Sequence, residues 1–382
     1  MKGRLTYAMI GGGTGASIGQ VHRRAIALDG RARLVAGALS STPEKSRKSA
    51  QDLGLDSDRS YTTFQELFTR EAQRQDRVDF VSIVTPNDTH HPIAKMALEH
   101  GFHVVLDKPA THTSAQAIEL KALAESKGLL CVVTYNYTGY PMIRQARAMI
   151  GDGELGMIRK VYLEYHQGWL AAKLESSGHK QASWRVDPLR AGLGGALGDI
   201  GTHAENLISF VTGLKIESLY ANLRAFVPDR LLDDDVSVMI NFQGGAHGVL
   251  TASQVCIGEA NGISLRVYGE RGGLSWRQDS ANDLRVSELN KNPVLYTRSG
   301  PDLHKDSLIS THTPPGHPEG YLEAFSNIYR GAIDAIIAQM NGNEKSRLAT
   351  MIPTISAGVQ GIKFVEKCVE SSQKNTQIDW AQ

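Results

Sequence analysis

The 382-residue sequence predicts an α/β protein: a doubly wound parallel sheet, followed by an α+β domain with a large open, mainly antiparallel sheet. Three observations predict this class. A glycine-rich turn follows the first strand, strands alternate with helices as far as residue 134, and the later strands alternate in polarity and are joined by tight turns. Because domains usually hold ~100–200 residues, we predict two domains, over 1–136 and 137–382.

The composition argues against several kinds of partner. The formal net charge is +1, and neither half of the chain is a block of one charge. The apolar runs are shorter than the ~18 residues of a membrane-spanning helix. The N-terminus lacks the apolar segment of a signal peptide, and the three cysteines show neither zinc spacing nor a disulfide framework. We therefore expect a cytoplasmic protein with no nucleic-acid, membrane or metal partner.

The first chemical feature is the glycine-rich turn over residues 11–19. It lies between a predicted strand, 5–10, and a predicted helix, 20–28, and a second strand over 32–39 follows. Glycines in this setting let the backbone approach a pyrophosphate, and the helix N-terminus supplies N–H groups. The spacing departs from the usual fingerprint, because three residues rather than two separate Gly15 and Gly19. A simple turn is the alternative, but the strand–turn–helix–strand order favours nucleotide binding.

The end of the second strand leaves the choice between NAD and NADP open. An acidic residue there would bind the ribose 2′-hydroxyl of NAD, but no carboxylate occurs before Glu44. Ser40 and Ser41 can hydrogen-bond a ribose hydroxyl, whereas Lys45 and Arg47 could meet a 2′-phosphate.

The alternation continues through helix 64–74, strand 79–84, helix 92–100, strand 103–106, helix 114–127 and strand 129–134. Ligands of such sheets bind beyond the carboxyl ends of the strands. Polar residues follow three of these ends, in the glycine turn, in Thr85-Pro86-Asn87 and in Asp107-Lys108-Pro109. We expect these three groups to meet at one edge of the sheet. Taken alone, Lys108 could equally be a solvated residue at a strand end.

The second half has the pattern of a sheet with one covered face. Strands are predicted at 158–167, 236–242, 246–253, 265–268 and 274–276, with tight turns in the last two hairpins. An exposed apolar sheet face usually marks an interface, so we predict a homodimer or homotetramer formed through this sheet. Helices follow at 318–340 and 352–370, and we expect the final one to pack back on the first domain.

A glycine-rich segment over residues 192–201 leads into a helix that begins near Asp199 and ends at Thr212. Asp199 and His203 are four residues apart and share one helix face. An aspartate in a first turn is often only a cap or a partner of the helix dipole. One Asp and one His do not make a recognisable metal site.

A polar and aromatic region precedes this helix, with Trp169 and then residues 180–188, which lack a helical period. Aromatic faces and bidentate donors suit a sugar ring, so Trp169, Trp184 and Arg185 are candidate substrate contacts. The alternative is that both tryptophans belong to the core. The section over 279–316 shows little periodicity.

Together these residues resemble the Gfo/Idh/MocA family of NAD(P)-dependent oxidoreductases. The resemblance spans nearly the whole chain, and its motifs occur in the family's order: Gly13-x-Gly15…Gly19-x-x-His22-x-x-Ala25, Thr85-Pro86-Asn87-x-x-His90, Asp107-Lys108-Pro109 and Gly198-Asp199-x-Gly201-x-His203. Two features depart from it: Asp107 stands where the family usually has Glu, and the glycine turn is one residue longer. The long turn and the segments 136–141 and 180–185 look most like the branch that contains levoglucosan dehydrogenase and glycoside 3-dehydrogenases.

The resemblance implies a Rossmann-type first domain and a set of residues with roles. Lys108, Asp199 and His203 would be catalytic. Substrate contacts would include these three with Tyr137, Trp169, Trp184 and Arg185. The cofactor, NAD with NADP not excluded, would contact Gly11, Gly13, Gly15, Ser17, Ile18, Gly19, Ser40, Ser41, Thr85, Asn87, His90, Asp107, Lys108 and Asn136.

These roles imply hydride transfer between nicotinamide and a secondary hydroxyl of a pyranose, anhydrosugar, glycoside or cyclitol, with C3 oxidation favoured. His203 would take the hydroxyl proton, Lys108 would stabilise the developing alkoxide, and Asp199 would orient the substrate. Two alternatives stay open: a glycoside-processing cycle of oxidation, elimination and reduction on tightly bound NAD, and a nucleotide-binding regulator without turnover.

Overall fold

A computed structural model describes residues 4–381, which fold into two compact units. The first holds the residues up to Gly139 together with Tyr321–Val359, and the second holds Tyr140–Gly320 with the residues after Val359. This division differs from a single boundary at residue 136, because the chain returns to the first unit at Tyr321 and enters the second unit again after Val359. The predicted packing of the final helix on the first domain stays a prediction.

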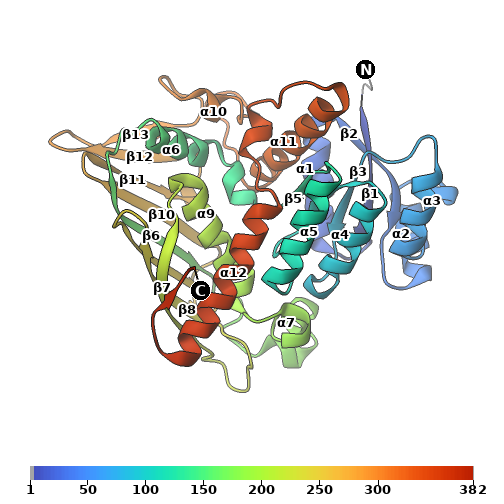
Figure 1. Ribbon diagram of the computed structural model, residues 1–382, viewed down its shortest axis with the longest axis horizontal. Helices are drawn as coiled ribbons and strands as arrows, with labels where there is room; N and C mark the ends of the chain where they lie inside the picture. The colour runs from blue at the N-terminus through green and yellow to red at the C-terminus, as the bar shows by residue number, and fades with distance from the viewer. Residues whose placement is uncertain (1–3, 382) are drawn as a thin grey trace. The chain divides into compact units, whose positions relative to one another are not determined.

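The first unit is built on a five-stranded parallel sheet with the order β2-β1-β3-β4-β5 (Figure 1). Its strands are β1 (Leu5–Gly11), β2 (Ala32–Ala38), β3 (Phe80–Val84), β4 (His103–Leu106) and β5 (Cys131–Val133). Both faces are buried, which is why the strands read as continuous apolar runs. Val104 and Leu106 belong to the core on one face, and Val105 belongs to the core on the other.

Helices cover each face of this sheet. One core is closed by α3 (Phe64–Gln73), α4 (His90–Glu99) and α5 (Ser114–Ser126). The other is closed by α1 (Ser17–Asp29), α2 (Pro43–Asp52) and α11 (Tyr321–Asn341). Helix α11 comes from late in the sequence, and its Phe325, Ile328 and Ile333 are fully enclosed in this core.

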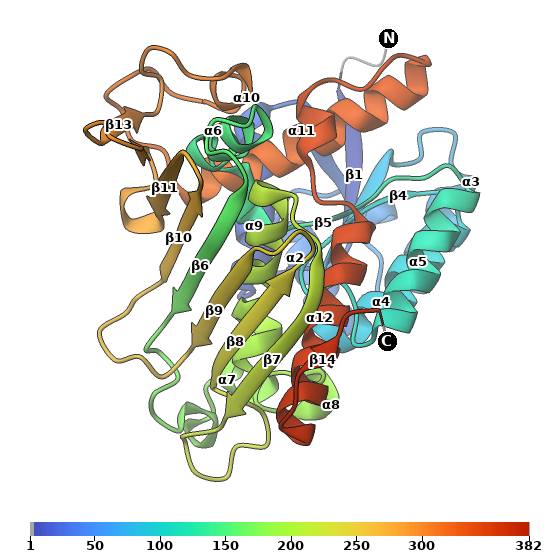
Figure 2. The same ribbon diagram turned by 60° about the vertical axis from the view of Figure 1, so that its left-hand side comes forward.

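The second unit is built on a nine-stranded sheet with the order β13-β12-β11-β10-β6-β9-β8-β7-β14, whose central strands lie side by side in Figure 2. Only β6 and β9 pair in parallel; the other neighbours are antiparallel. The strands are β6 (Ile158–His166), β7 (Ile216–Arg224), β8 (Asp235–Phe242), β9 (His247–Ser253), β10 (Gly262–Gly269), β11 (Gly272–Arg277), β12 (Asp283–Glu288), β13 (Val294–Thr297) and β14 (Ile378–Asp379). Together with the first unit, this sheet confirms the predicted fold class.

Helices of its own unit lie on one face of the nine-stranded sheet. The helices of this unit are α6 (Pro141–Gly151), α7 (Lys180–Arg185), α8 (Pro188–Ala191), α9 (Thr202–Thr212), α10 (Lys305–Leu308) and α12 (Ile355–Lys374), the last of which begins in the first unit. Helices α6 and α9 pack on the sheet. Along β8 the residues alternate between this core and the opposite face, where Ser237 and Met239 are exposed.

Two irregular regions of the sequence contain regular structure. Residues 180–188, which lack a helical period, form α7 and the start of α8, because the side chains of His179 and Asp187 accept hydrogen bonds from the first-turn amides of Ala182 and Leu189. The section over 279–316 contains β12, β13 and α10. Strand β13 is largely exposed, so burial leaves little pattern in its sequence. Among residues 4–381, no helix is long and apolar enough to span a lipid bilayer.

Candidate functional site

In the first unit, the glycine turn connects β1 to the start of α1. Gly11, Gly12 and Gly15 have φ angles of 77°, 71° and 84°, which side-chain-bearing residues rarely adopt. The turn is tied to neighbouring elements, since Gly13 donates its N–H to Leu39 O at 3.0 Å and Thr14 donates its N–H to Ser49 Oγ at 3.0 Å. Because α1 begins at Ser17 and no side chain caps it, its first-turn amides are available to an anion.

Gly19 sets how closely α1 approaches the turn. A Cβ atom there would lie 2.3 Å from Gly12 Cα and 2.6 Å from Gly12 O, and both are backbone atoms that cannot rotate away. The turn is therefore a close-packed cradle before α1, and its geometry requires glycine at position 19.

We expect Gly19→Ala to raise the Kd for NAD by about tenfold or more, because the added methyl forces the helix away from the turn. Isothermal titration with NAD measures it. Gly151→Ala is the control, because a Cβ atom there meets no atom within 4 Å. Equal NAD affinity in both variants would contradict the cradle.

Ser40 and Ser41 follow β2, where the ribose would bind. Ser40 Oγ accepts the N–H of Thr42 at 3.3 Å, and Ser41 is exposed. Lys45 and Arg47 lie exposed on α2. The segment after β2 therefore holds hydroxyl groups that could bind the ribose of NAD and cations that could bind the 2′-phosphate of NADP.

The ends of β3 and β4 are joined through His90. Its Nδ1 lies 2.8 Å from Pro109 O and its Nε2 lies 2.9 Å from Thr85 O. Burial lowers the pKa of this imidazole, and the charge of Asp107 and the two carbonyl groups oppose that shift. Asn87 is buried beside it in the same turn. His90 thus connects Thr85 to Pro109, which belong to two of the three strand-end groups that the sequence analysis expects to meet.

Asp107 holds the end of β4 and the residue after it. Its Oδ1 accepts the N–H of Lys108 at 2.9 Å and the hydroxyl of Thr134 at 2.9 Å. His22 Nε2 lies 3.7 Å away, and His22 Nδ1 is 2.6 Å from Tyr329 Oη. Although burial alone would raise the pKa of Asp107, the nearby His22 and Lys108 hold it well below its usual range. Asp107 is therefore an anion that fixes the backbone at Lys108.

Lys108 itself is half-buried at this strand end, and the peptide bond from Lys108 to Pro109 is cis. Asn136 and Tyr137 lie in a turn after β5 and are buried. Among residues 4–381, Asn136 Nδ2 has no hydrogen-bond partner. A buried amide donor left over beside the carboxyl ends of the strands suits a polar group of a bound dinucleotide.

In the second unit, Asp199 and His203 stand at the start of α9. Asp199 lies in a single π-helical turn, Leu197–Gly201, which continues directly into α9. Such turns are rare and are frequently found at functional sites. His203 is buried, with its ring 6.3 Å from that of Tyr165.

The loop before Asp199 is fixed by Asp233. Its two carboxylate oxygens accept the N–H groups of Gly195 and Leu197, each at 2.7 Å, and its carbonyl accepts the N–H of Ala196 at 2.9 Å. Gly195 has no room for a side chain, since a Cβ atom would lie 2.1 Å from Asp233 O. No local sequence pattern predicts this contact, because 38 residues separate the partners.

Asp199 is also held by two side-chain donors. Arg185 Nε and Gln254 Nε2 each donate to Asp199 Oδ2 at 2.9 Å. The Arg185 guanidinium lies over the ring of Trp184, 4.2 Å from its centroid, and 5.8 Å from that of Trp169. Both indoles are half-buried. Sequence reasoning found Arg185 and the tryptophans but missed Gln254; the available signal was a polar residue directly after a strand.

Glu205 lies on the same helix and faces the core of the second unit. Its Oε1 accepts hydrogen bonds from Ser209 and Gln360, each at 2.6 Å, and among the described residues its Oε2 has no partner. Burial raises the pKa of Glu205 to about 7, while these hydrogen bonds and Lys215 oppose the shift. The carboxyl is therefore protonated in the folded protein over part of the range where it ionises in the unfolded chain.

Glu205 should make the protein less stable as the pH rises. Its folded pKa of about 7 exceeds an unfolded value of ~4.3, so stability is full below that value and falls by on the order of 3 kcal/mol as pH rises to about 7. The free energy of unfolding is measured with urea at a series of pH values. Glu205→Gln should remove this decrease with rising pH, whereas Glu217→Gln, at an exposed position, should keep it. Identical pH profiles for all three proteins would refute the assignment.

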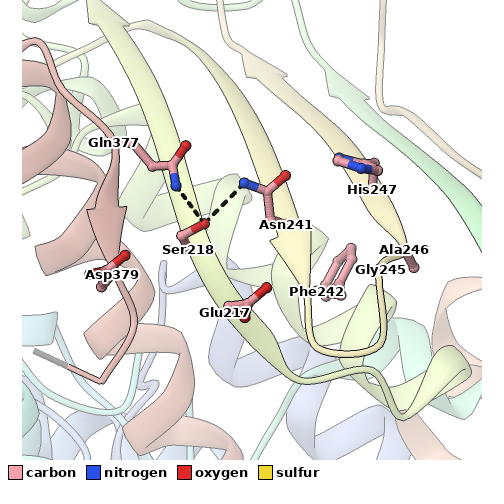
Figure 3. A pocket seen from close by; sticks show the side chains of 9 residues that line it. All are labelled: Glu217, Ser218, Asn241, Phe242, Gly245, Ala246, His247, Gln377 and Asp379. Atoms are coloured by element: carbon pink, nitrogen blue, oxygen red, sulfur yellow. Dashed lines mark hydrogen bonds between the residues drawn. The ribbon is translucent and has the colours of Figure 1, made fainter.

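A separate surface hollow of about 430 Å³ lies at the other end of the nine-stranded sheet (Figure 3). Gln377 and Asn241 both donate to Ser218 Oγ there, at 2.9 and 3.0 Å. Ser218 pairs with Asn241 near the start of β7, whereas Gln254 follows the end of β9, which pairs with the start of β8. The hollow contains none of the predicted site residues.

Comparison with known proteins defines the class. Residues 5–146 match the oxidoreductase family model with an NAD-binding Rossmann fold, and residues 143–275 match the Gfo/Idh/MocA C-terminal domain model. An uncharacterised oxidoreductase of Bacillus subtilis is 36% identical over 97% of this chain and 95% of its own length. The chain belongs to the Gfo/Idh/MocA family and is an NAD-binding oxidoreductase.

Two relatives of known structure or activity narrow the comparison. A crystal structure of an inositol dehydrogenase homolog from Azotobacter vinelandii with NAD⁺ is 36% identical, covers 99% of this chain and 98% of its own, and superposes with a TM-score of 0.93. A second structure of that homolog holds NADH and myo-inositol, with a TM-score of 0.91. Levoglucosan dehydrogenase of Pseudarthrobacter phenanthrenivorans is 25% identical over 79% of this chain and 80% of its own. The family predicted from the sequence is confirmed, and the inositol dehydrogenase homolog is more similar than the levoglucosan dehydrogenase.

Proposed function

We propose that this protein reversibly oxidises a secondary hydroxyl of a neutral sugar or cyclitol, with C3 oxidation favoured on a pyranose, anhydrosugar or glycoside. The observation that carries the proposal is the set of groups around Asp199. The Arg185 charge is matched by the Asp199 carboxylate, so the surroundings combine a neutralised ion pair, amides and two half-buried indoles. This chemistry recognises hydroxyl groups and the apolar faces of a ring rather than a phosphate or a carboxylate.

The catalytic roles follow from the properties of each side chain. Bound NAD supplies the hydride acceptor. His203 is proposed as the base that takes the hydroxyl proton, because an imidazole titrates near neutral pH. Lys108 is proposed to stabilise the alkoxide as it develops, and Asp199 to orient the substrate hydroxyls. The residues that hold NAD are proposed to be the glycine turn with Ser17 and Ile18, the serines after β2, and Thr85, Asn87, His90, Asp107, Lys108 and Asn136.

Relatives support the substrate class. The inositol dehydrogenase homolog was crystallised with myo-inositol, a neutral cyclitol. Tyr137, Trp169, Trp184 and Arg185 are proposed to contact the ring of the substrate. The open face of the nine-stranded sheet, with Met239 59% exposed and Tyr268 42% exposed, supports a homodimer or homotetramer formed through that face.

A substrate panel tests the function. Purified protein is mixed with myo-inositol and other cyclitols, free pyranoses, levoglucosan and alkyl glycosides, with NAD and NADP in separate series, while nicotinamide absorbance is followed. We expect reduction of NAD by at least one neutral polyol. Absence of turnover with every neutral polyol, together with turnover of a phosphorylated or carboxylated substrate, would overturn the proposed class.

A further inference from the structure

Gln254 is placed beside Asp199 by the sheet. It follows β9 directly, its N–H donates to Asp234 O at 2.8 Å, and its carbonyl accepts the N–H of Leu170 at 3.1 Å. The side chain is only 2% exposed. Asp233 and Asp234 are consecutive, so one turn holds both the loop that carries Asp199 and the backbone of Gln254. The amide therefore meets the carboxylate from a rigid element.

The orientation of the Gln254 amide is settled by its neighbours. The Trp169 indole can only donate, and it donates to Gln167 Oε1 at 2.9 Å. Gln167 therefore presents its oxygen to Gln254 as well, 3.4 Å from Gln254 Nε2. Gln167 Nε2 donates to Asn261 Oδ1 at 2.7 Å. The same oxygen accepts a hydrogen bond from the hydroxyl of Tyr165 at 2.8 Å.

With its NH₂ group facing two acceptors, Gln254 has one arrangement that satisfies both. It donates to Gln167 Oε1 and to Asp199 Oδ2, so a chain of neutral amides joins the carboxylate to the strand ends of β6 and β9. Arg185, the second donor, lies on α7, which has only six residues. The sheet-based donor is the more rigid of the two.

We infer that Gln254 is a positioning residue for Asp199, which fixes the direction of its carboxylate and keeps it an acceptor for substrate hydroxyls. The inference rests on the proposed function. It assigns no contact between Gln254 and the substrate, so its effect is expected in turnover and in pH dependence more than in KM.

Two substitutions separate the donor from the shape of the side chain. Gln254→Glu keeps the shape but replaces the NH₂ donor by an oxygen, so two carboxyl groups meet at hydrogen-bond distance and cannot both ionise. Gln254→Met removes the donor without adding charge. Gln243→Glu, on an exposed turn of the same unit, is the matched control for added charge.

For turnover, kcat and KM are measured with the preferred polyol between about pH 5 and pH 9. Gln254→Met should lower kcat about tenfold at every pH, the loss of one hydrogen bond to a charged group. Gln254→Glu should lower kcat about a hundredfold relative to the wild type at the alkaline end. At the acid end, where the carboxyl pair shares a proton, its kcat should approach that of the wild type. Gln243→Glu should follow the wild type. A Gln254→Glu profile parallel to that of the wild type would overturn the inference.

Urea unfolding of the same variants, which needs no activity, distinguishes the two hypotheses. If the carboxylates meet, the midpoint of Gln254→Glu should fall relative to the wild type as the pH rises, and that of Gln254→Met should not. This result in a protein that oxidises no polyol would support the contact and reject the proposed function. Midpoint differences that are independent of pH would reject the contact itself.

Discussion

Replacing Lys108 by alanine is expected to lower kcat for hydride transfer by about 10²–10⁴-fold, while the Kd for NAD rises by about tenfold at most, because Lys108 is one of many proposed contacts with NAD. The reason is its placement. Asp107 fixes the backbone at Lys108 through a 2.9 Å hydrogen bond, and His90 bonds the following residue, Pro109, at 2.8 Å. An ammonium group held at a strand end can stabilise an alkoxide without reorganising during the reaction.

The measurement is single-turnover reduction of NAD at saturating substrate, with a substrate deuterated at the reacting carbon to show that hydride transfer is observed. Lys121→Ala is the control, because Lys121 lies on α5 with its side chain 40% exposed and makes only a 3.9 Å ion pair with Glu125. Turnover by Lys108→Ala within about threefold of the wild type would remove Lys108 from the mechanism.

His203→Ala should produce a comparable loss, about 10²–10⁴-fold in kcat for oxidation, because it removes the proposed proton acceptor. His203 is buried, so the substitution leaves a space beside Tyr165 that a free imidazole can enter. We expect added imidazole to restore part of the activity, and the restored rate to increase with the fraction of unprotonated imidazole. A purely structural histidine would show no such dependence.

His247→Ala is the matched control, since His247 is exposed and lines the hollow on the nine-stranded sheet described above (Figure 3). The double variant Lys108→Ala/His203→Ala adds a second test. When two side chains act on the same proton transfer, the double variant loses less kcat than the product of the two single losses. Strict additivity in the logarithm of kcat would assign the two residues to different steps.

The fold was predictable where local pattern and burial agree. The strands of the first unit are buried on both faces, and turn glycines punctuate them, so the observed bounds lie within a few residues of those predicted. Prediction failed where an element is very short or leaves little burial pattern in the sequence. Helix α7 begins where the His179 side chain accepts a hydrogen bond from the N–H of Ala182, and β13 exposes most of its residues.

The candidate site shows the same division. Lys108, Asp199 and His203 stand in short motifs that can be read along the chain. Gln254 and Asp233 act on Asp199 and its loop from 55 and 38 residues away, so only strand pairing brings them there. Asp107, shorter than the glutamate usual in the family, still reaches the N–H of Lys108 and the hydroxyl of Thr134.

Helix α11 has a consequence for how the protein is made. The core on one face of the parallel sheet is completed by Phe325, Ile328, Ile333 and Ile336, which pack with residues of β1 such as Tyr7 and Met9. On the ribosome, that face of the sheet has α1 and α2 but lacks α11 until translation has passed Tyr140–Gly320 of the second unit. The nucleotide-binding half is therefore not a separable gene segment, and any recombination that exchanges it must carry two pieces of coding sequence together.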